Sequence, residues 1–287
     1  MNSFFRCFIL SGVMMLIALA GLCQQEEPST QLTQLPKLLT VPFVNKSPEI
    51  DGIITPEEWY GALEIGAKMP LFSMDEMEEM AESWEEEAPP EIKPAEFHHI
   101  TIYMMNDMKN LYLAIHIIDE DYNDLFGKEE EEEEKEEMED YEEDFDYDCL
   151  SISFDSNNNL KMERDEDIKM VFFADGEALY VDDYYKPPFA GSITRDVQED
   201  GRAAARHSNP EGKGDYFIEI EIPLKSGDKQ DLAVNPGDKM RFNLIYMDHC
   251  SLLKLNTLIG GFFGIEEDAT DMWGQIELSG KPQPQEK

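Results

Sequence analysis

The sequence predicts an all-β protein built as an antiparallel β-sandwich. Short runs in which apolar and polar residues alternate recur along much of the 287-residue chain, and a period of two places one face of a strand on a core and the other in water. In the segment DYFIEIEIP, for example, three isoleucines alternate with Glu219 and Glu221. Strand-like segments follow one another without a regular alternation of strands and helices, which argues against a parallel sheet.

The domain is expected to begin near Leu38, where LLTVPFV predicts a first strand. Asp51 and Gly52 follow as a turn signal. The segment TPEE then supplies an N-cap threonine, a first-turn proline and a capping-box glutamate, which predict a short helix of one or two turns. Trp59 lies inside this helix, and we expect its ring to pack at one end of the β core.

The middle and the end of the chain supply the remaining strands. FHHITIYMM and LYLAIHII, joined by NDMKN, predict a hairpin whose apolar face carries Leu111, Leu113, Ile115 and Ile117. Trp273 lies on the end strand and is assigned, like Trp59, to packing. The later predicted strands are CLSISFD, IKMVFFA, ALYVD, GSITRDV, RAAAR, DYFIEIEIP, KMRFNLIYMD and MWGQIEL.

Residues 1–23 have the features of a signal peptide: a short basic region, an apolar stretch and the small residues Ala18 and Ala20 before a polar segment. Lipid attachment at Cys23 is the less favoured alternative, because Leu22 is not small. We therefore expect a secreted or extracytoplasmic protein that is not inserted in a membrane after cleavage.

A single domain, residues 38–279, is expected between a flexible leader at 24–37 and a disordered tail at 280–287. The acidic insertion at 74–91 is expected to be a loop or a weakly amphipathic helix, because its methionines have helical spacing. The insertion at 128–147 is too charged to bury and is expected to stay solvated, as a spacer or as a weak tail for calcium or a cationic polymer. The chain has 63 acidic against 23 basic residues, a net charge of -40. This charge repels nucleic acid and anionic lipid, and it leaves neutral or cationic partners, divalent cations among them.

Six motifs, taken in order, resemble carbohydrate-binding module family 9 and its DOMON-like relatives over residues 41–278. The resemblance implies an immunoglobulin-like β-sandwich in a secreted, non-catalytic module that binds polysaccharide or glycan termini, is an accessory to carbohydrate catabolism and carries structural calcium. We expect no enzymatic activity, because the nucleophile-elbow, metalloprotease and phosphate-loop motifs are missing. The six motifs are IDG with EW, LYLAI with DED, DCLSISFDSNNN, DYFIEIEIPL, FNLIYMD and WGQIEL.

The same resemblance points to sugar-binding residues. Members of the family hold the end of a sugar chain between two aromatic faces. The first position falls on Phe145, near Tyr147, and the second falls on Phe262 or Phe263. A basic residue on the next strand matches Lys169. Aromatic rings outside the core alternation can also stack on sugars, which adds Trp84 and the Tyr184–Tyr185 pair. The sugar-binding candidates are Trp84, Phe145, Tyr147, Lys169 and Phe263.

The segment DSNNNLKMERDE resembles a calcium-binding loop in the spacing of its oxygen-bearing residues. It departs from that pattern at Leu160, which replaces the usual glycine, and it follows a strand and not a helix. An acidic hairpin loop without an ion is the alternative. The predicted Ca²⁺ ligands are Asp155, Asn157, Asn159, the carbonyl of Lys161, Glu163 and Glu166.

Cys149 and Cys250 are the two cysteines outside the predicted signal peptide. Disulfides persist in secreted proteins, so the two either pair or remain thiols. Cys149 has the opposite strand parity to the apolar Leu150, whereas Cys250 continues the parity of Tyr246.

Two further functions remain open from the sequence. His98, His99 and His116 lie on neighbouring predicted strands. With the 16 methionines of the chain and the run Met247-Asp248-His249, they allow a haem-binding DOMON-like electron-transfer protein. The other alternative is an acidic calcium-binding scaffold that has lost its sugar site.

Overall fold

The computed structural model describes residues 38–73, 76, 94, 96–119, 146–161, 165–174, 177–185, 193–209, 214–251, 258–261 and 273–280. These segments form thirteen strands. The predicted signal peptide, the leader and most of both acidic insertions lie outside the described residues. No helix within the described segments is long and apolar enough to cross a membrane.

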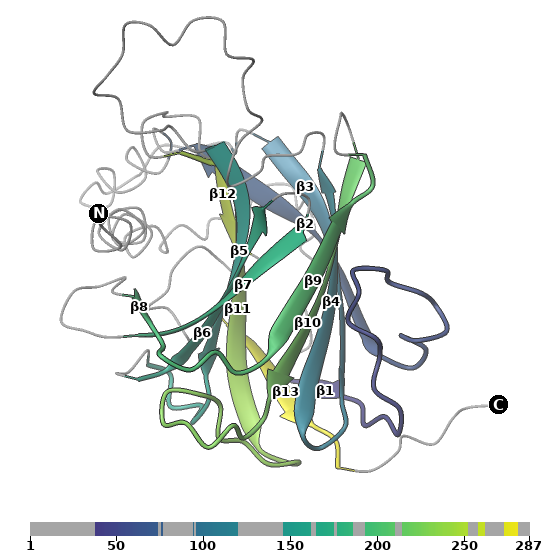
Figure 1. Cartoon of the computed structure of the whole chain (residues 1–287), viewed down its shortest axis with the longest axis vertical. Coiled ribbons are helices and arrows are strands. Elements are labelled where there is room, and N and C mark those ends of the chain that lie inside the picture. Colours follow the sequence, from purple (N-terminus) through teal and green to yellow (C-terminus); the bar gives the residue numbers. More distant parts are fainter. Residues whose placement is uncertain are drawn as a thin grey trace, which may run out of the picture.

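The strands form two layers that face one another (Figure 1). The first layer runs in the order β2-β3-β4-β10-β9. Its strands are β2 (Leu63–Ser73), β3 (Glu96–Asn106), β4 (Asn110–Asp119), β10 (Gly214–Pro223) and β9 (Arg202–His207).

The second layer runs in the order β8-β7-β6-β5-β11, with β13 pairing β11 and β1 pairing β13. A short strand, β12, pairs with both β11 and β2 and so connects the two layers. The strands of this layer are β8 (Ile193–Arg195), β7 (Glu177–Tyr185), β6 (Asp167–Ala174), β5 (Asp146–Asp155), β11 (Lys239–Ser251), β12 (Leu258–Gly261), β13 (Gly274–Leu278) and β1 (Leu39–Val41).

Every ladder between the named strands is antiparallel except that of β1 with β13, which is parallel. The predicted hairpin is present, because β3 pairs β4 with His99 opposite Ile118 and Asn106 opposite Leu111. The antiparallel β-sandwich that the alternation predicts is therefore confirmed.

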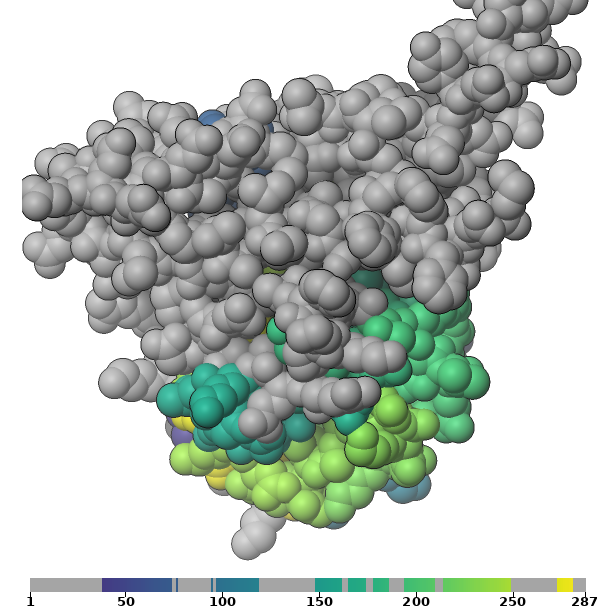
Figure 2. All heavy atoms as spheres, turned by 90° about the vertical axis from the view of Figure 1, so that its left-hand side faces the viewer, coloured from purple at the N-terminus to yellow at the C-terminus, as the bar shows by residue number. Residues whose placement is uncertain are grey.

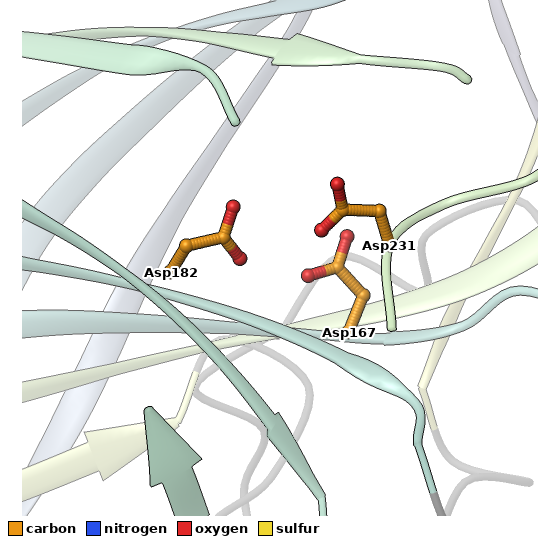
Figure 3. A group of neighbouring side chains, drawn as sticks. All are labelled: Asp167, Asp182 and Asp231. Carbon is orange, nitrogen blue, oxygen red and sulfur yellow. The ribbon is translucent and has the colours of Figure 1, made fainter. Parts of the chain in front are cut away.

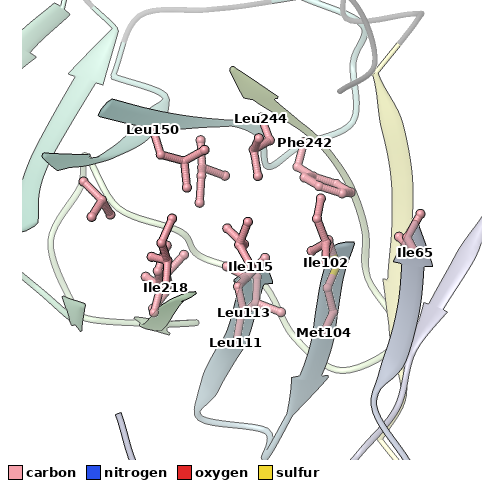
Figure 4. Packing of buried hydrophobic residues seen from close by; sticks show 14 of the residues in the cluster. Ile65, Ile102, Met104, Leu111, Leu113, Ile115, Leu150, Ile218, Phe242 and Leu244 are labelled. Carbon is pink, nitrogen blue, oxygen red and sulfur yellow. The ribbon is translucent and has the colours of Figure 1, made fainter. Parts of the chain in front are cut away.

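Side chains from the facing sides of both layers interdigitate in one continuous core (Figure 4). Leu111, Leu113 and Ile115 of β4 face Leu150 of β5 and Leu244 of β11, and all five are at most 1% exposed. Burial of this apolar surface drives the two layers together. A polar clamp closes one edge of the core: the buried Asn106 side-chain amide donates to the carbonyls of Val41, Pro42 and Ser279 at 3.0, 3.1 and 3.3 Å.

Residues 42–62, here called the roof, cover part of the outer face of the first layer. The predicted capping box is present: Thr55 Oγ1 donates to Glu58 Oε2 at 2.9 Å and accepts from the Glu58 amide at 3.4 Å. A single helical turn follows, closed by the Trp59 amide donating to the Thr55 carbonyl at 3.2 Å. The Trp59 ring packs on Met105 and Tyr112 in a cluster separate from the main core. The expectation that it fills an end of the core is therefore wrong, because the ring lies on the outer face of the sheet.

Glu219 of β10 anchors the roof. Its carboxylate accepts from the Trp59 Nε1–H at 2.8 Å and from the amides of Asp51 and Gly52 at 3.0 and 2.9 Å. Alternation predicts that Glu219 faces water, but the roof buries it completely. Gly52 is suited to this contact, because its φ is 76° and a Cβ there would lie 2.9 Å from the Arg206 side chain.

The pattern analysis missed two strands. In β2 the core positions Ile65, Met69 and Leu71 are buried, but Gly66 and Pro70 lower the strand propensity of the segment. The strand β12 has only four residues, LIGG, two of them glycine. β2 and β12 pair with each other and so connect the two layers. The alternation of apolar and polar residues therefore predicted the strands within each layer but not the strands that connect the layers.

Candidate functional site

A buried ionic centre lies in the second layer around Lys169 of β6. We call Lys169, Asp167, Asp182 and Asp231 the Lys169 centre. The three carboxylates converge from β6, β7 and the segment between β10 and β11 (Figure 3). Lys169 Nζ lies 2.8 Å from Asp167 Oδ1 and 3.1 Å from Asp231 Oδ1, and it also donates to Asp182 Oδ1. All four side chains are at most 2% exposed.

Strand pairing explains how these residues meet. Asp167 and Lys169 are two positions apart on β6 and therefore share a face. Lys169 is directly opposite Asp182 on β7. Asp231 is brought to them by the segment that follows β10, 62 residues along the chain from Lys169.

The carboxylates of the Lys169 centre also fasten two loops. Asp167 Oδ2 accepts from the Leu232 amide at 3.2 Å, and Asp182 Oδ2 accepts from the Asp200 amide at 3.0 Å. The ammonium group of Lys169 thus joins β6 and β7 to the loop after β8 and to the loop after β10. Structural metal ions cross-link loops in the same way.

Burial and neighbouring charge shift the protonation of these groups. Burial raises the pKa of Asp167 to about 7 and that of Asp182 to about 6, although Lys169 acts in the opposite direction on both. Burial by itself would lower the pKa of Lys169, but the charge of Asp167 and then those of Tyr180 and Asp182 raise it above its ordinary value. Lys169 therefore stays positively charged, whereas the raised pKa values of Asp167 and Asp182 allow these two carboxyl groups to exchange protons near neutral pH.

The structure describes the side chains of three sugar-binding candidates, Lys169, Tyr184 and Tyr185. Tyr184 is partly exposed and Tyr185 is buried, on neighbouring positions of β7. Lys169 is the most fully enclosed of the three. Its side chain is 1% exposed, and its ammonium faces three carboxylates between the layers and not the solvent. The amino group is thus already engaged. Of the other candidates, Trp84, Phe145 and Phe263 lie outside the described residues. Tyr147 belongs to β5, but its side chain lies outside the described part.

The predicted calcium loop connects β5 to β6, and Asp155 organises its first half. Asp155 Oδ1 accepts from the Asn159 amide at 3.1 Å, and Oδ2 accepts from the Leu160 amide at 3.0 Å. Leu160 adopts a φ of 67°, the conformation that the missing glycine would favour. Asn157 Nδ2 donates to Glu166 Oε1 at 3.4 Å. Both oxygens of the first predicted ligand thus support the turn, and calcium binding here stays a prediction.

The remaining predicted calcium ligands of this loop differ in their exposure to solvent. Asn159 and Lys161 are exposed and Glu166 is buried, while Glu163 lies outside the described residues. The neighbouring Asn158 is tied to the second layer, because its Oδ1 accepts from Arg241 Nε at 3.0 Å and from Gln275 Nε2 at 2.8 Å.

The two cysteines lie on adjacent strands. Cys149 of β5 is opposite Met247 of β11, and the backbone of Cys250 is opposite Tyr147, with a register irregularity between these two pairs. Cys149 is fully buried although its parity places it on the outer side of the layer. The side chain of Cys250 lies outside the described part, so the disulfide stays a prediction.

The three histidines considered for haem or metal do not converge. His98 is buried on the core side of β3, whereas His99 is exposed on the outer side. His116 of β4 also points outward and lies opposite Phe217 of β10. Among the described residues, the acidic or histidine side chains grouped closely enough to hold a metal ion are the three aspartates of the Lys169 centre.

Sequence reasoning missed a second feature, on the part of the first layer's outer face that lies beyond the contacts of the roof. There, side chains that point away from the core form what we call the open strip. Phe97 is 39% exposed, with Lys68 Nζ 4.4 Å from its ring centre, and Ile118 is 47% exposed. The alternation along β3, β4 and β10 places these side chains on the outer face of the layer. The sequence did not show which part of that face the roof covers, so their exposure could not be predicted. The open strip consists of Lys68, Phe97, His99, His116, Ile118, Asp215 and Phe217.

Paired rings form the centre of the open strip. The rings of His116 and Phe217 stack with their centres 4.7 Å apart and their planes at 7°. His116 Nε2 lies 2.8 Å from Asp215 Oδ2, which fixes the imidazole on its ring partner. The strip therefore combines flat apolar rings with hydrogen-bonding groups at their edges.

Comparison with solved structures found six chains of similar fold, three of which are the following. A carbohydrate binding module family 9 protein from Caldicellulosiruptor kristjanssonii in complex with cellotriose has a TM-score of 0.45 and 14% identity, over 87% of this chain and 97% of that one. The glucose complex has a TM-score of 0.44 and 14% identity, over 87% and 98%. A candidate carbohydrate-binding protein from Bacteroides uniformis has a TM-score of 0.45 and 10% identity, over 85% and 99%.

Two of these structures belong to the family that the sequence resembles. No protein-family model matches the chain, and no curated protein matches it.

Proposed function

We propose that this chain is a secreted, non-catalytic carbohydrate-binding protein that holds a polysaccharide or the end of a glycan on the open strip. The observation that carries the proposal is the set of outward-facing rings next to polar side chains. Phe97 and the His116–Phe217 pair offer flat apolar surface, and Asp215, His99 and Lys68 surround them.

The chemistry of a pyranose suits such a surface. The axial C–H groups of the sugar ring give it an apolar face that packs on aromatic rings, and its hydroxyl groups lie around the edge, where carboxylate, imidazole and ammonium groups can bond to them. An exposed apolar patch on an otherwise strongly charged protein is also a common mark of a binding surface. The order of the six sequence motifs supports the same class of ligand.

A glycan array followed by titration with a bound polysaccharide tests the proposal. Phe97→Ala should weaken binding about tenfold, which corresponds to ~1.4 kcal/mol, because Phe97 is exposed and its loss leaves the core unchanged. Phe217→Ala should weaken binding at least as much. Tyr60→Ala is the matched control, because Tyr60 is an aromatic residue of the roof that is 72% exposed and lies outside the open strip.

The same experiment separates the open strip from the aromatic positions predicted from the sequence. If Trp84→Ala, Phe145→Ala or Phe263→Ala abolishes binding while Phe97→Ala does not, the sugar binds at those predicted positions and the open-strip assignment is wrong. If no glycan binds a protein that melts cooperatively, the carbohydrate-binding function itself is wrong.

A further inference from the structure

Lys68 carries a positive charge on the outer face of the first layer, at one end of the open strip. Its side chain is exposed. Within the part of the chain that the structure describes, Lys68 Nζ forms no ion pair and no hydrogen bond. It lies over the Phe97 ring, 4.4 Å from the ring centre. The ammonium group is therefore available to an anion from solution.

A second nitrogen-bearing side chain lies beside Lys68. His99 of β3 is directly opposite Lys68 of β2, and the Cβ atoms of such cross-strand pairs are about 4.5–5.5 Å apart. His99 is exposed, and no described residue bonds to its imidazole. A neutral imidazole donates one N–H, and a protonated one donates two. Phe97 shares the face of His99, because the two are two positions apart on β3. We call Lys68, Phe97 and His99 the Lys68 corner.

The outward-facing carboxylates of the first layer lie far from the Lys68 corner. Among the described residues of β2, β3, β4 and β10, the closest are Glu64, four positions along β2, and Asp215, three strands away in the same cross-strand row. These spacings are about 13 and about 14 Å, longer than the ~8 Å over which salt screens charges under physiological conditions. Asp215 also lies 2.8 Å from His116 Nε2. An anion at the Lys68 corner therefore meets a locally positive surface.

The Lys68 corner belongs to the side of the molecule opposite the Lys169 centre. Figure 2 views the molecule from the side of the second layer, and the purple and blue of β2 and β3 hardly appear among the described atoms there. The Lys169 centre lies in that second layer, whereas the corner lies on the outer face of the first. A ligand at the corner is therefore separate from the buried carboxylates described above.

Lys68 also covers the aromatic surface on which a sugar would stack. A cation–π contact between exposed groups is weaker than a charge-assisted hydrogen bond to a carboxylate. A carboxylate on the ligand can therefore draw the ammonium off the Phe97 ring and uncover the ring face. A uronic acid provides both partners, because its carboxylate is bonded to C5, at the edge of the pyranose ring whose C–H groups pack on aromatic rings.

The charge of the whole chain limits how acidic the ligand can be. The net charge of -40 repels a polyanion, and this repulsion grows with the number of charges on the ligand. A single carboxylate on an otherwise neutral saccharide gains the contact with Lys68 at the least repulsion. The end of a glycan is the place where a single acidic residue presents itself in this way.

We propose that the open strip is specific for a glycan that ends in a uronic acid residue. Lys68 and His99 bind its carboxylate, while its ring stacks on Phe97. The inference rests on the proposed function, because it names the ligand class of the same surface.

Calorimetric titration with matched disaccharides at pH 7 and low salt tests the inference. The terminal residue is glucuronic acid or glucose in one pair, and galacturonic acid or galactose in the other. The acidic member of at least one pair should bind about fivefold more tightly than its neutral counterpart. Raising NaCl to about 0.5 M should remove most of that preference, because salt screens exposed charges.

Variants of exposed lysines locate the carboxylate. Lys68→Gln should abolish the preference for the acidic sugar without weakening the neutral one, and Lys68→Arg, which keeps the charge, should retain the preference. Lys46→Gln is the matched control, because Lys46 is an exposed lysine of the roof that lies outside the open strip. It should leave the preference unchanged.

Several results would overturn the inference. Equal affinity for acidic and neutral sugars, with Phe97→Ala weakening both, would leave the carbohydrate-binding function intact and remove the selection of uronic acids. A preference that persists in Lys68→Gln would place the carboxylate elsewhere. A terminal glucose 6-sulfate that binds as tightly as glucuronic acid would show selection of any anion and not of a carboxylate. If no glycan binds, acidic or neutral, the inference and the proposed function fail together.

Discussion

The roof and the Lys169 centre bury carboxylates in opposite ways. Glu219 beneath the roof receives three neutral N–H donors, from Trp59, Asp51 and Gly52, at 2.8–3.0 Å. In the Lys169 centre, three carboxylates share one ammonium, and oxygens remain without hydrogen-bond partners. Three neutral donors satisfy the hydrogen-bonding capacity of the buried Glu219 carboxylate, whereas burial together with an excess of carboxylates over ammonium groups raises the pKa values of Asp167 and Asp182.

Removing the ammonium should have the largest effect on stability. Lys169→Met leaves three buried carboxylates without their cation, and we expect a loss of about 3–5 kcal/mol in the free energy of unfolding. Denaturant titration measures it. Lys229→Met is the matched control: Lys229 pairs with Asp165, but its side chain is 75% exposed, so the expected loss is below about 1 kcal/mol. Equal losses in the two variants would show that the Lys169 centre is no more than a surface-type ion pair.

The second-largest effect is expected in the pH dependence of stability, through buried carboxylates in and next to the Lys169 centre. The pKa of Asp167 is raised from 3.8 to about 7, that of Asp182 to about 6 and that of Asp183, raised by burial against the charge of Arg195, to about 7. Between pH 4 and pH 7 the folded state therefore holds protons that the unfolded state has released, so stability falls as the pH rises through this range and then levels off.

The part of this fall that comes from Asp182, whose pKa is raised from 3.8 to about 6, is on the order of 3 kcal/mol. Melting curves of the wild type and of Asp182→Asn measure it, and the variant should show the shallower dependence. A wild-type stability that rises from pH 4 to pH 7 would mean that these carboxylates are ionised in the folded protein and held by a positive charge.

The smallest expected effect is at the roof. Glu219→Ala strands the Trp59 Nε1–H and two backbone amides, at a cost of about 1–3 kcal/mol. Glu219→Gln keeps one carbonyl oxygen that can accept from part of these three donors, so its unfolding free energy should fall less than that of Glu219→Ala. The loss should be the same with and without calcium, because no cation takes part. Hydrogen exchange at the Asp51 and Gly52 amides locates the change, and unaltered exchange in Glu219→Ala would show that these hydrogen bonds do not hold the roof.

Sequence alternation was sufficient to predict the layers but not what lies on them. The parity of Leu111 to Ile117 correctly identified the core face of β4, because that information is local to one strand. Glu219 was assigned to water because the roof that buries it comes from a segment about 160 residues away. The hairpin register depends on neighbouring residues, whereas burial of an outer face depends on distant ones.

The same distinction between local and distant information explains how much of each site could be predicted from the sequence. Asp167 and Lys169 are visible as a D-x-K pattern on a predicted strand, but their meeting with Asp182 requires the β6–β7 register, and that with Asp231 requires the path of a loop. The open strip needed both the parity of β3, β4 and β10 and the extent of the roof. Most aromatic positions suggested by the family resemblance, Phe145 and Phe263 among them, lie outside the described residues and stay predictions.

The pairing of β1 with β13 has a consequence for how the chain folds. Leu39 lies opposite Ile276 and Val41 opposite Leu278, so the first described strand hydrogen-bonds to the last one. During synthesis, β1 leaves the ribosome more than 230 residues ahead of its partner. Its ladder can close only after β13 has emerged, and contacts between such distant segments form slowly. Completion of the second layer is therefore a late event that follows translation of almost the entire domain.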